Sequence, residues 1–402
     1  MPEFFKVVRC EDALAMLRDN FPHQRAEEID LSAALNRVLA RDIVGQEDIP
    51  GFERSTVDGY AVRARDTFGS SESMPGFLTM KGEVVMGEQP EFSIREGWCA
   101  WIPTGGMLPP GADAVVMVEH TERLGEDTVL VNRPVGPYDN VIRVGEDARK
   151  GETIFTQGHR LRPQDIGVLA ALGLNRVEVV ASHRVGIISS GDEIVPITCT
   201  PNIGQVRDVN SYSLAAAVEK AGGTPRVYGV IPDNMELLTA TLAKAVRENH
   251  LVILSGGSSI GQRDFSLKAM LSLPEASMLF HGVAARPGKP TLAVRVDGGL
   301  IVGLPGHPVA ALMMFEIFCA PLLGTAAMRR VRATLTANVA SQAGRDDFVR
   351  VELIDDGERM LANPVHGKSG LVRVMSSAQG YVHIPYEKQG IKAGEPVLVT
   401  LF

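Results

Sequence analysis

Three short turns within residues 251–310 carry residue types that could bind an oxyanion. The first is a glycine- and serine-rich loop at residues 255–261, which Asp264 follows. The second is Arg286-Pro287-Gly288-Lys289-Pro290, and the third, at residues 304–310, reads Leu-Pro-Gly-His-Pro-Val-Ala. Backbone N–H groups of a glycine-rich loop can converge on an anion, a lysine between prolines adds a cation, and a carboxylate can hold a metal ion. Together they predict a site for a phosphate or similar oxyanion beside a metal ion.

Each of these turns alone would be an ordinary feature, because a pair of glycines after a strand usually forms only a turn. Their order carries the functional interpretation, since each turn falls where a predicted strand ends or a predicted helix begins. In an open α/β sheet, the loops at the carboxyl ends of the strands converge on one crevice, where ligands bind. The pattern therefore predicts an anion site at that edge without identifying the ligand.

Alternating strands and helices over residues 179–326 predict a doubly wound parallel sheet around these turns. The expected strands are residues 184–189, 225–230, 251–254 and 300–303, and the expected helices are residues 212–221, 235–248, 266–273 and 308–324. The first strand is followed by Ser190-Gly191-Asp192-Glu193, and the second by Asp233. These carboxylates should lie on the same edge as Lys289, although Asp233 is also a natural N-cap for the next helix.

The flanking residues predict three further domains. Residues 8–21 and 29–39 have helical periodicity, as do residues 161–173, so residues 1–45 and 140–178 are expected to form an elongated helical domain. Residues 46–139 are expected to be an inserted β domain, with strands at 77–82, 83–86, 99–102, 114–118 and 128–132. Short strands of even spacing over residues 327–402 predict a small C-terminal β-barrel. Within it, Lys368-Ser369-Gly370 is a polar turn that could line a ligand groove.

Composition excludes several classes of protein. A formal net charge of −8, from 40 basic and 48 acidic side chains, speaks against nucleic acid as a main partner. Any anion must then be met by local arginine and lysine side chains. The sequence lacks a signal-peptide pattern and an apolar run of ~20 residues. Four scattered cysteines are typical of reduced cytoplasmic thiols and argue against a zinc or iron–sulfur site.

Nine motifs in a fixed order are similar to those of one family. They are Ser55-Thr56-Val57-Asp58-Gly59-Tyr60-Ala61-Val62, Pro103-Thr104-Gly105, Pro110-Gly111-Ala112-Asp113-Ala114-Val115-Val116, Gly145-Glu146-Asp147, Ser190-Gly191-Asp192-Glu193, Gly204-Gln205-Val206-Arg207-Asp208-Val209-Asn210, the loop at residues 256–264, Pro287-Gly288-Lys289-Pro290 and Gly303-Leu304-Pro305-Gly306. The chain resembles the MoeA family of molybdopterin molybdenumtransferases, to which the C-terminal region of gephyrin also belongs, over nearly all of its length.

The resemblance implies the four domains above, with the α/β domain binding molybdopterin. It implies a cytoplasmic homodimer whose active site combines the α/β domain of one subunit with the inserted β domain of the other. The implied reaction uses Mg²⁺ to insert molybdate into adenylylated molybdopterin with release of AMP. A MogA-type adenylyltransferase and chaperones of molybdoenzymes are the implied partners, with no nucleic acid and no membrane.

The resemblance also implies the site residues. The implied catalytic residues are Asp58, Thr104, Asp147, Glu193, Asp233, Asp264 and Lys289, of which Glu193, Asp233 and Asp264 would hold the metal ion. The implied substrate-binding residues are Gly256, Gly257, Ser258, Ser259, Gly261, Pro287, Gly288, Pro305, Gly306, His307 and Pro308. The carboxylates would orient water against the phosphoanhydride, and Lys289 would pair with molybdate or phosphate.

The sequence departs from the family pattern at Ser258, His307 and Ala310, which replace valine, asparagine and serine, and at Asn234, which replaces the second of two aspartates. Three alternatives therefore stay open: a tungstate-inserting enzyme, a non-catalytic pterin carrier or scaffold, and an adenylyltransferase of the MogA type. The long N-terminal region disfavours the last, because that family typically consists of the α/β domain alone.

Overall fold

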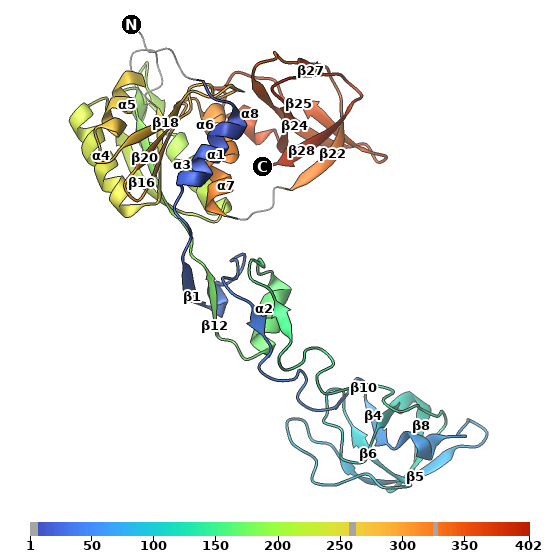
Figure 1. Cartoon of the computed structure of the whole chain (residues 1–402). Helices are drawn as coiled ribbons and strands as arrows, with labels where there is room; N and C mark the ends of the chain where they lie inside the picture. Colours follow the sequence, from blue (N-terminus) through green and yellow to red (C-terminus); the bar gives the residue numbers. More distant parts are fainter. Residues whose placement is uncertain (1–6, 257–262, 325–328) are drawn as a thin grey trace. The chain divides into compact units, whose positions relative to one another are not determined.

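The computed structural model describes residues 7–256, 263–324 and 329–402, except for the side chains of residues 263 and 264. The chain divides into two compact units (Figure 1). Unit 1 comprises Met1–Arg25 and Ala181–Phe402, and unit 2 comprises Ala26–Val180.

A six-stranded sheet is the centre of unit 1. Its strand order is β16 (Thr224–Ile231), β13 (Arg184–Ser190), β17 (Leu251–Gly256), β21 (Gly299–Leu304), β20 (Leu292–Val296) and β18 (Ser277–His281). The first four strands are parallel, which confirms the four predicted strands. The sheet is not parallel throughout, because β20 pairs antiparallel with both of its neighbours, β21 and β18. Asp297-Gly298 between β20 and β21 is a hairpin turn signal that the parallel interpretation overlooked.

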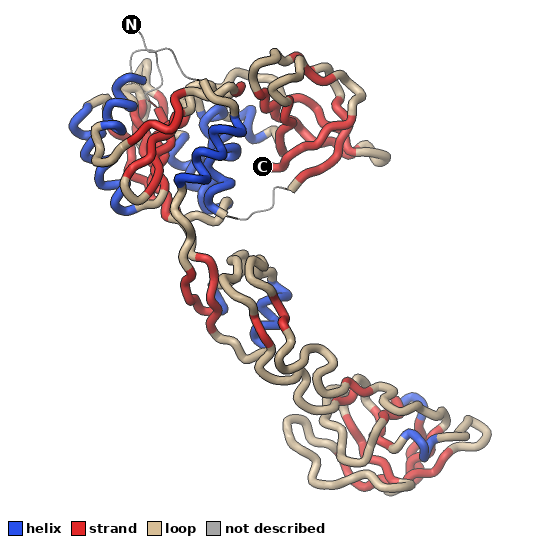
Figure 2. Tube along the Cα trace, in the orientation of Figure 1, coloured by secondary structure: helices blue, strands red, loops and turns tan. Residues whose placement is uncertain are grey.

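Helices cover both faces of this sheet (Figures 1 and 2). One face packs against α3 (Asn210–Lys220), α6 (Pro308–Met314) and α7 (Ala320–Leu323), and the other against α4 (Met235–Glu248) and α5 (Arg263–Leu271). Leu251 and Ile253 of β17 join the first core, whereas Val252 and Leu254 join the second. Successive side chains of a strand point to opposite faces, so a strand covered on both sides reads as a continuous apolar run. A π-helical turn, Phe315–Cys319, interrupts the single helix predicted over residues 308–324.

Helix α1 (Cys10–Asn20) confirms the predicted helix at residues 8–21, but it packs against the α/β core. Its buried side chains Cys10, Ala13 and Leu17 belong to the same apolar cluster as β13 and β17. The assignment of residues 1–25 to the elongated domain is therefore wrong. Helical periodicity identifies the face that is buried but not the surface that covers it, which explains the error.

The prediction of a second helix near the N-terminus, at residues 29–39, is also wrong. Residues 29–39 begin in strand β1 (Ala26–Asp30), which pairs antiparallel with β12 (Arg176–Val180), and continue as the 3₁₀ turn Leu31–Ala33. A short amphipathic segment can take either form, and pairing with β12 decided it. The predicted helix at residues 161–173 is confirmed as α2 (Pro163–Ala171), after which Gly173 has a φ of +72°.

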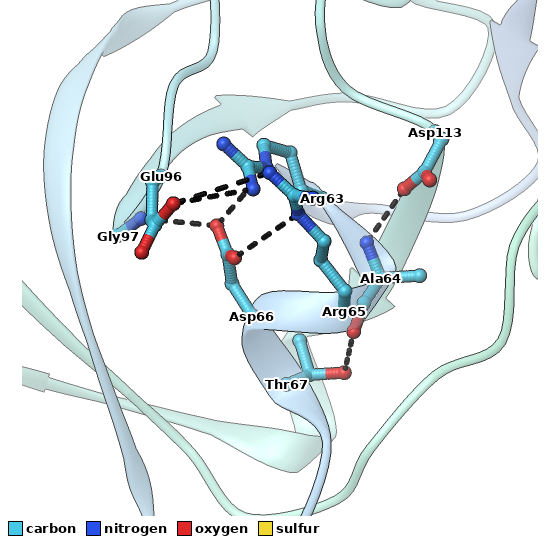
Figure 3. Close-up of polar contacts among 8 residues, drawn as sticks. All are labelled: Arg63, Ala64, Arg65, Asp66, Thr67, Glu96, Gly97 and Asp113. Carbon is cyan, nitrogen blue, oxygen red and sulfur yellow. Dashed lines mark hydrogen bonds and ion pairs between the residues drawn. The ribbon is translucent and has the colours of Figure 1, made fainter.

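The β module of unit 2 is a six-stranded sheet. Its order is β7 (Ala114–Met117), β4 (Gly59–Val62), β6 (Trp98–Ile102), β5 (Gly76–Glu83), β9 (Thr128–Val131) and β8 (Thr121–Leu124). The strand predicted at residues 83–86 does not form, because β5 ends at Glu83. Two hydrogen bonds attach the 3₁₀ turn Ala64–Thr67 to residues that flank the strands of this sheet (Figure 3). Asp66 accepts one from the Gly97 N–H, and Asp113 accepts one from the Ala64 N–H.

The C-terminal residues form a closed five-stranded barrel, as predicted. Its strands are β22 (Arg330–Leu335), β25 (Met360–Pro364), β24 (Asp346–Asp355), β26 (Gly380–Ile384) and β28 (Pro396–Leu401), and the β24–β26 pairing closes the ring. Phe348 and Tyr381 of the barrel join the apolar core of the α/β sheet. Strand β19 (Ala285–Arg286) pairs with β24 and brings the barrel next to the Lys289 turn.

The remaining short elements are β2 (Ile43–Val44), β3 (Arg54–Ser55), β10 (Val141–Ile142), β11 (Thr153–Phe155), β14 (Ile194–Val195), β15 (Val206–Arg207), β23 (Val339–Ala340), α8 (Arg373–Ser376), β27 (Gly390–Ile391) and the 3₁₀ turn Val118–His120.

Candidate functional site

A cavity of about 1630 Å³ lies in unit 1, between the carboxyl edge of the α/β sheet and the C-terminal barrel. The α/β side supplies residues that follow β13, β17 and β21, together with the 286–290 turn and residues 206–210. The barrel side supplies residues 344–350 and 365–370. A cavity of this size accommodates a ligand larger than a single oxyanion.

The lining of the cavity is cationic. Six arginine and lysine side chains face it, against three carboxylates; they are Arg207, Arg286, Lys289, Arg345, Arg350 and Lys368, against Glu193, Asp208 and Asp347. Asp347 is buried and paired with Arg345 at 2.9 Å. Asp208 is also buried and accepts hydrogen bonds from the Ser189 hydroxyl and the Ser211 N–H. Two of the three carboxylates are thus already engaged, so the cavity keeps an excess of positive charge in a chain that is acidic as a whole.

Arg350 is the clearest sign that an anion belongs here. Its guanidinium is half-buried and donates from one nitrogen to the Gly367 carbonyl at 3.1 Å. Its Nη1 is buried and has no hydrogen-bond partner among the described residues. Burial lowers the pKa of Arg350. A buried cationic donor without a partner is costly. Arg350 lines the cavity, where the charge of an anion would offset that cost.

The Lys289 turn is held rigidly by its uncharged neighbours. Gly288 has a φ of +104°, and a Cβ on it would lie 2.1 Å from the buried Met314 Sδ. The Gly288 carbonyl accepts hydrogen bonds from both the N–H and the hydroxyl of Thr291. The Lys289 carbonyl accepts from the Val283 N–H at 3.0 Å. The turn therefore fixes the backbone of Lys289 on the cavity wall. Pro287, Gly288 and Lys289 all line the cavity, and their predicted roles stay predictions.

The turn before α6 forms another part of the wall, and Asn210 holds it. The Asn210 side chain donates hydrogen bonds to the Gly306 carbonyl at 2.8 Å and to the Ser255 hydroxyl at 2.7 Å. His307, at the N-cap of α6, contacts Ser369 of the barrel through a hydrogen bond of 2.8 Å. Pro305, Gly306, His307 and Pro308, all predicted from the sequence, line the cavity.

A group of carboxylates lies at the ends of β13 and β16. The Asp233 N–H donates to Asp192 at 3.0 Å, and the Ser190 hydroxyl donates to the Asp233 carboxylate at 3.3 Å. Burial, followed by repulsion from Asp192 and Glu193, raises the pKa of Asp233. Glu193 lines the cavity, whereas Asp233 is not among its lining residues. Among the described side chains, no set of three or more His, Cys, Asp or Glu has the geometry of a complete metal site.

Gly256, at the end of β17, lines the cavity and cannot be replaced without strain. Its φ is +113°, and a Cβ would lie 2.0 Å from the Ser190 carbonyl oxygen. The predicted residues Gly257, Ser258, Ser259 and Gly261 lie outside the described part of the chain, as does the side chain of Asp264. Their roles stay predictions.

Two of the three predicted site residues of unit 2, Asp58 and Thr104, form a smaller polar corner. The N–H and the hydroxyl of Thr104 both donate to the same oxygen of Asp58, at 2.7 and 2.8 Å. These two bonds, the backbone one first, lower the pKa of Asp58. Asp147 is exposed, and its N–H donates to the Ile49 carbonyl. The structure thus joins Asp58 to Thr104 and keeps the Asp58 carboxylate ionised.

Three family models together match most of the chain. Residues 8–173 match the MoeA N-terminal region (domain I and II), residues 186–325 match a probable molybdopterin-binding domain, and residues 332–402 match the MoeA C-terminal region (domain IV). The chain is 33% identical to the molybdopterin molybdenumtransferase of Bacillus subtilis, covering 93% of this chain and 89% of that protein. The chain belongs to the MoeA family.

Further comparisons agree with membership of the MoeA family. A putative molybdopterin biosynthesis protein of Methanocaldococcus jannaschii is 33% identical over 94% of this chain and 93% of its own. A crystal structure of the MoeA protein of Pyrococcus horikoshii OT3 has a TM-score of 0.85 at 34% identity, covering 99% of this chain and all of that one. Another MoeA structure from a Pyrococcus has a TM-score of 0.83 at 37% identity. In the described part of this MoeA protein, no helix is both long and apolar enough to span a membrane.

Several cavity residues of this MoeA protein were not singled out from the sequence. They are Arg207, Asp208, Asn210, Arg345 and Arg350. The first three fall inside quoted family motifs, which did not distinguish residues that contact a ligand from residues that support the site. Arg345 and Arg350 lie in the barrel, where the sequence predicted strands but did not indicate which of their side chains face a ligand. Lys368 and Ser369, noted as a possible groove-lining turn, do line the cavity.

Proposed function

We propose that this protein is a molybdopterin molybdenumtransferase, which inserts molybdate into adenylylated molybdopterin and releases AMP. The main support is the cationic cavity, in which Lys289 and Arg350 face a space large enough for a nucleotide-capped pterin. Membership of the MoeA family and the printed name of the Bacillus subtilis relative support the coarser statement that it is a transferase of molybdenum cofactor biosynthesis.

The charged groups suit the two anions of this reaction. Molybdate and the phosphoanhydride both carry negative charge, which Lys289 and Arg350 would neutralise through charge-assisted hydrogen bonds. The sulfur atoms that bind molybdenum would come from the pterin, because Cys10, Cys99 and Cys319 are buried and the exposed Cys199 does not line the cavity. Burial raises the pKa of Cys99 to about 12 and that of Cys10 and Cys319 above the usual range. Thiols in that state are poor metal ligands.

A Mg²⁺ ion fits the carboxylates beside the cavity. Mg²⁺ usually binds through one or two carboxylates and completes its shell with water and substrate phosphate oxygens. Burial raises the pKa of Asp233, repulsion from Asp192 and Glu193 adds to this effect, and a cation beside these carboxylates would relieve the repulsion. When bound, the ion would neutralise charge on the departing phosphate.

A test combines purified protein, adenylylated molybdopterin, molybdate and Mg²⁺, and measures AMP release together with the activation of an apo-molybdoenzyme. We expect both with the wild-type protein. Replacing Lys289 by alanine should lower the AMP release rate by about tenfold or more, since charge-assisted contacts of this kind contribute ~1.5–3 kcal/mol. Lys392→Ala, at an exposed position of unit 1 outside the cavity, is the matched control and should behave as wild type. Intact adenylate after incubation with the wild-type protein would contradict the proposal.

We also propose a homodimer whose active site takes Lys289 from one subunit and Asp58 from the other. The support is the resemblance to the MoeA family together with the ionised Asp58–Thr104 corner, which has the character of a catalytic carboxylate.

Two inactive variants, Asp58→Ala and Lys289→Ala, provide the test when they are mixed and allowed to exchange subunits. Random exchange in a two-fold dimer restores one intact site in each heterodimer, so about one quarter of the wild-type activity should return. If both residues acted within one subunit's own site, each heterodimer would have no intact site and mixing would restore nothing.

A further inference from the structure

One hydrogen bond in the cavity wall joins the α/β part of unit 1 to the barrel. His307 Nδ1 and the Ser369 hydroxyl are 2.8 Å apart, and both residues line the cavity. The Val309 N–H of α6 donates to the Ser369 carbonyl at 3.2 Å, so the barrel loop is fixed to the start of this helix at two points. A Cβ on Gly370 would lie 3.9 Å from the His307 ring, which places this loop directly against the imidazole.

The direction of this hydrogen bond depends on the proton at Nδ1. A neutral imidazole that carries its proton on Nε2 can only accept at Nδ1, so the Ser369 hydroxyl must donate its single proton to it. An imidazolium always carries a proton on Nδ1 and donates to the Ser369 oxygen. The hydroxyl proton of Ser369 is then left to donate to another acceptor in the cavity.

We propose that His307 is a positioning residue whose protonation turns the Ser369 hydroxyl into a hydrogen-bond donor for the oxyanion in the cavity. The proposal rests on the proposed function in so far as it takes that anion to be molybdate. The oxyanion should therefore bind more tightly as His307 gains a proton. The asparagine that the family usually has at this position cannot titrate, although its side-chain N–H can donate permanently to Ser369.

The groups around His307 favour this coupling. The charged side chains that line the same cavity are Arg207, Arg286, Lys289, Arg345, Arg350 and Lys368, with Glu193, Asp208 and Asp347. An anion bound among them attracts a further positive charge on a neighbouring imidazole. Because binding linkage is reciprocal, an anion that favours the protonated form must bind that form more tightly.

Calorimetric titration of the full-length protein with molybdate, at about pH 6.5 and about pH 8.5, tests the proposal across the range where histidine changes charge. Sulfate serves as a second probe, because it remains a dianion over this range. We expect wild-type protein to bind both anions about fivefold to tenfold more tightly at the lower pH, the effect of about one charge-assisted hydrogen bond. Titration in two buffers of different ionisation enthalpy should also show proton uptake on binding.

His307→Asn should abolish most of the pH dependence of anion binding and the proton uptake. Its affinity for the anions at the higher pH should equal or exceed that of the wild type. Ser369→Ala should weaken binding at the lower pH and flatten the profile. His23→Asn, at an exposed histidine outside the cavity, is the matched control and should keep the wild-type pH ratio. An unchanged pH ratio in His307→Asn overturns this inference and leaves the proposed function standing. Failure of the wild type to bind either anion at both pH values would overturn the proposed function and the inference with it.

Discussion

Arg350 is a cavity-lining residue whose burial acts against stability. Its guanidinium is half-buried, and one of its nitrogens is buried without a hydrogen-bond partner among the described residues. Burying a cation without a counter-ion destabilises a fold. We therefore interpret Arg350 as part of the binding surface of the cavity and not as part of the barrel's own framework.

This interpretation predicts opposite effects of Arg350→Met on binding and on stability. Molybdate affinity should fall by about tenfold or more, because a charge-assisted hydrogen bond is lost. The free energy of unfolding should stay within ~1 kcal/mol of wild type, because methionine keeps the apolar stem and removes an unpartnered charge. Calorimetry and urea denaturation measure the two quantities. A large loss of stability with unchanged molybdate affinity would assign Arg350 a structural role.

At the scale of the element, α2 shows a helix start that the sequence predicted and the structure explains. Asp165 is buried and accepts hydrogen bonds from the Arg162 backbone N–H and from its guanidinium, and it also contacts His159 at 2.8 Å. The Arg162 guanidinium, as the largest cause, holds the pKa of Asp165 well below its usual range, and His159 adds to this effect.

The lowered pKa gives Asp165 a stabilising effect that depends on pH. A carboxyl whose folded pKa lies below its unfolded value of ~3.9 stabilises the fold above that value and loses this effect as the pH falls towards the folded pKa. Asp165→Asn should therefore destabilise α2 by about 1–3 kcal/mol near neutral pH. The difference in stability between the variant and the wild type should shrink below about pH 4. Hydrogen exchange of the α2 amides in the full chain measures this stability, and Asp127→Asn, at an exposed position, is the control. Equal protection of the variant and the wild type at neutral pH would contradict the prediction.

The elements also show where the sequence was sufficient. Strands β13, β17 and β21 were predicted, because a strand buried on both faces has an apolar run that local sequence reveals. Strand β16 was also predicted, although it is an edge strand without a buried residue. Residues 29–39 were assigned to a helix, although β1 exists only through its pairing with β12. Local periodicity cannot report a partner that lies 146 residues away, as Asp30 and Arg176 do.

At the scale of the whole molecule, the ends of unit 2 lie side by side. Ala26 pairs with Val180, the first and last residues of the unit. The unit has apolar cores of its own, formed by the two faces of the β module and by α2 with its neighbours. A unit whose two ends pair with each other and whose hydrophobic cores are formed by its own residues can fold alone.

We expect residues 26–180 to fold when expressed as a separate fragment. Circular dichroism should show a β-rich spectrum with a cooperative thermal transition, and the polar cluster around Asp66 should protect the Gly97 amide from exchange. Asp66→Ala is expected to remove that protection selectively. A fragment without a cooperative transition would show that unit 2 depends on the remainder of the chain.

The sequence by itself determined the elements of the α/β domain, the closed barrel and the MoeA family, because these follow from local periodicity and from ordered motifs. Only the tertiary structure decided that α1 packs on the α/β sheet and that the barrel supplies one wall of the cavity. Arg207, Lys289 and Arg350 are far apart in a chain whose net charge is −8, so composition gave no sign of a cationic site. Their charges line one cavity only because folding brings together the segment at residues 206–210, the 286–290 turn and the barrel.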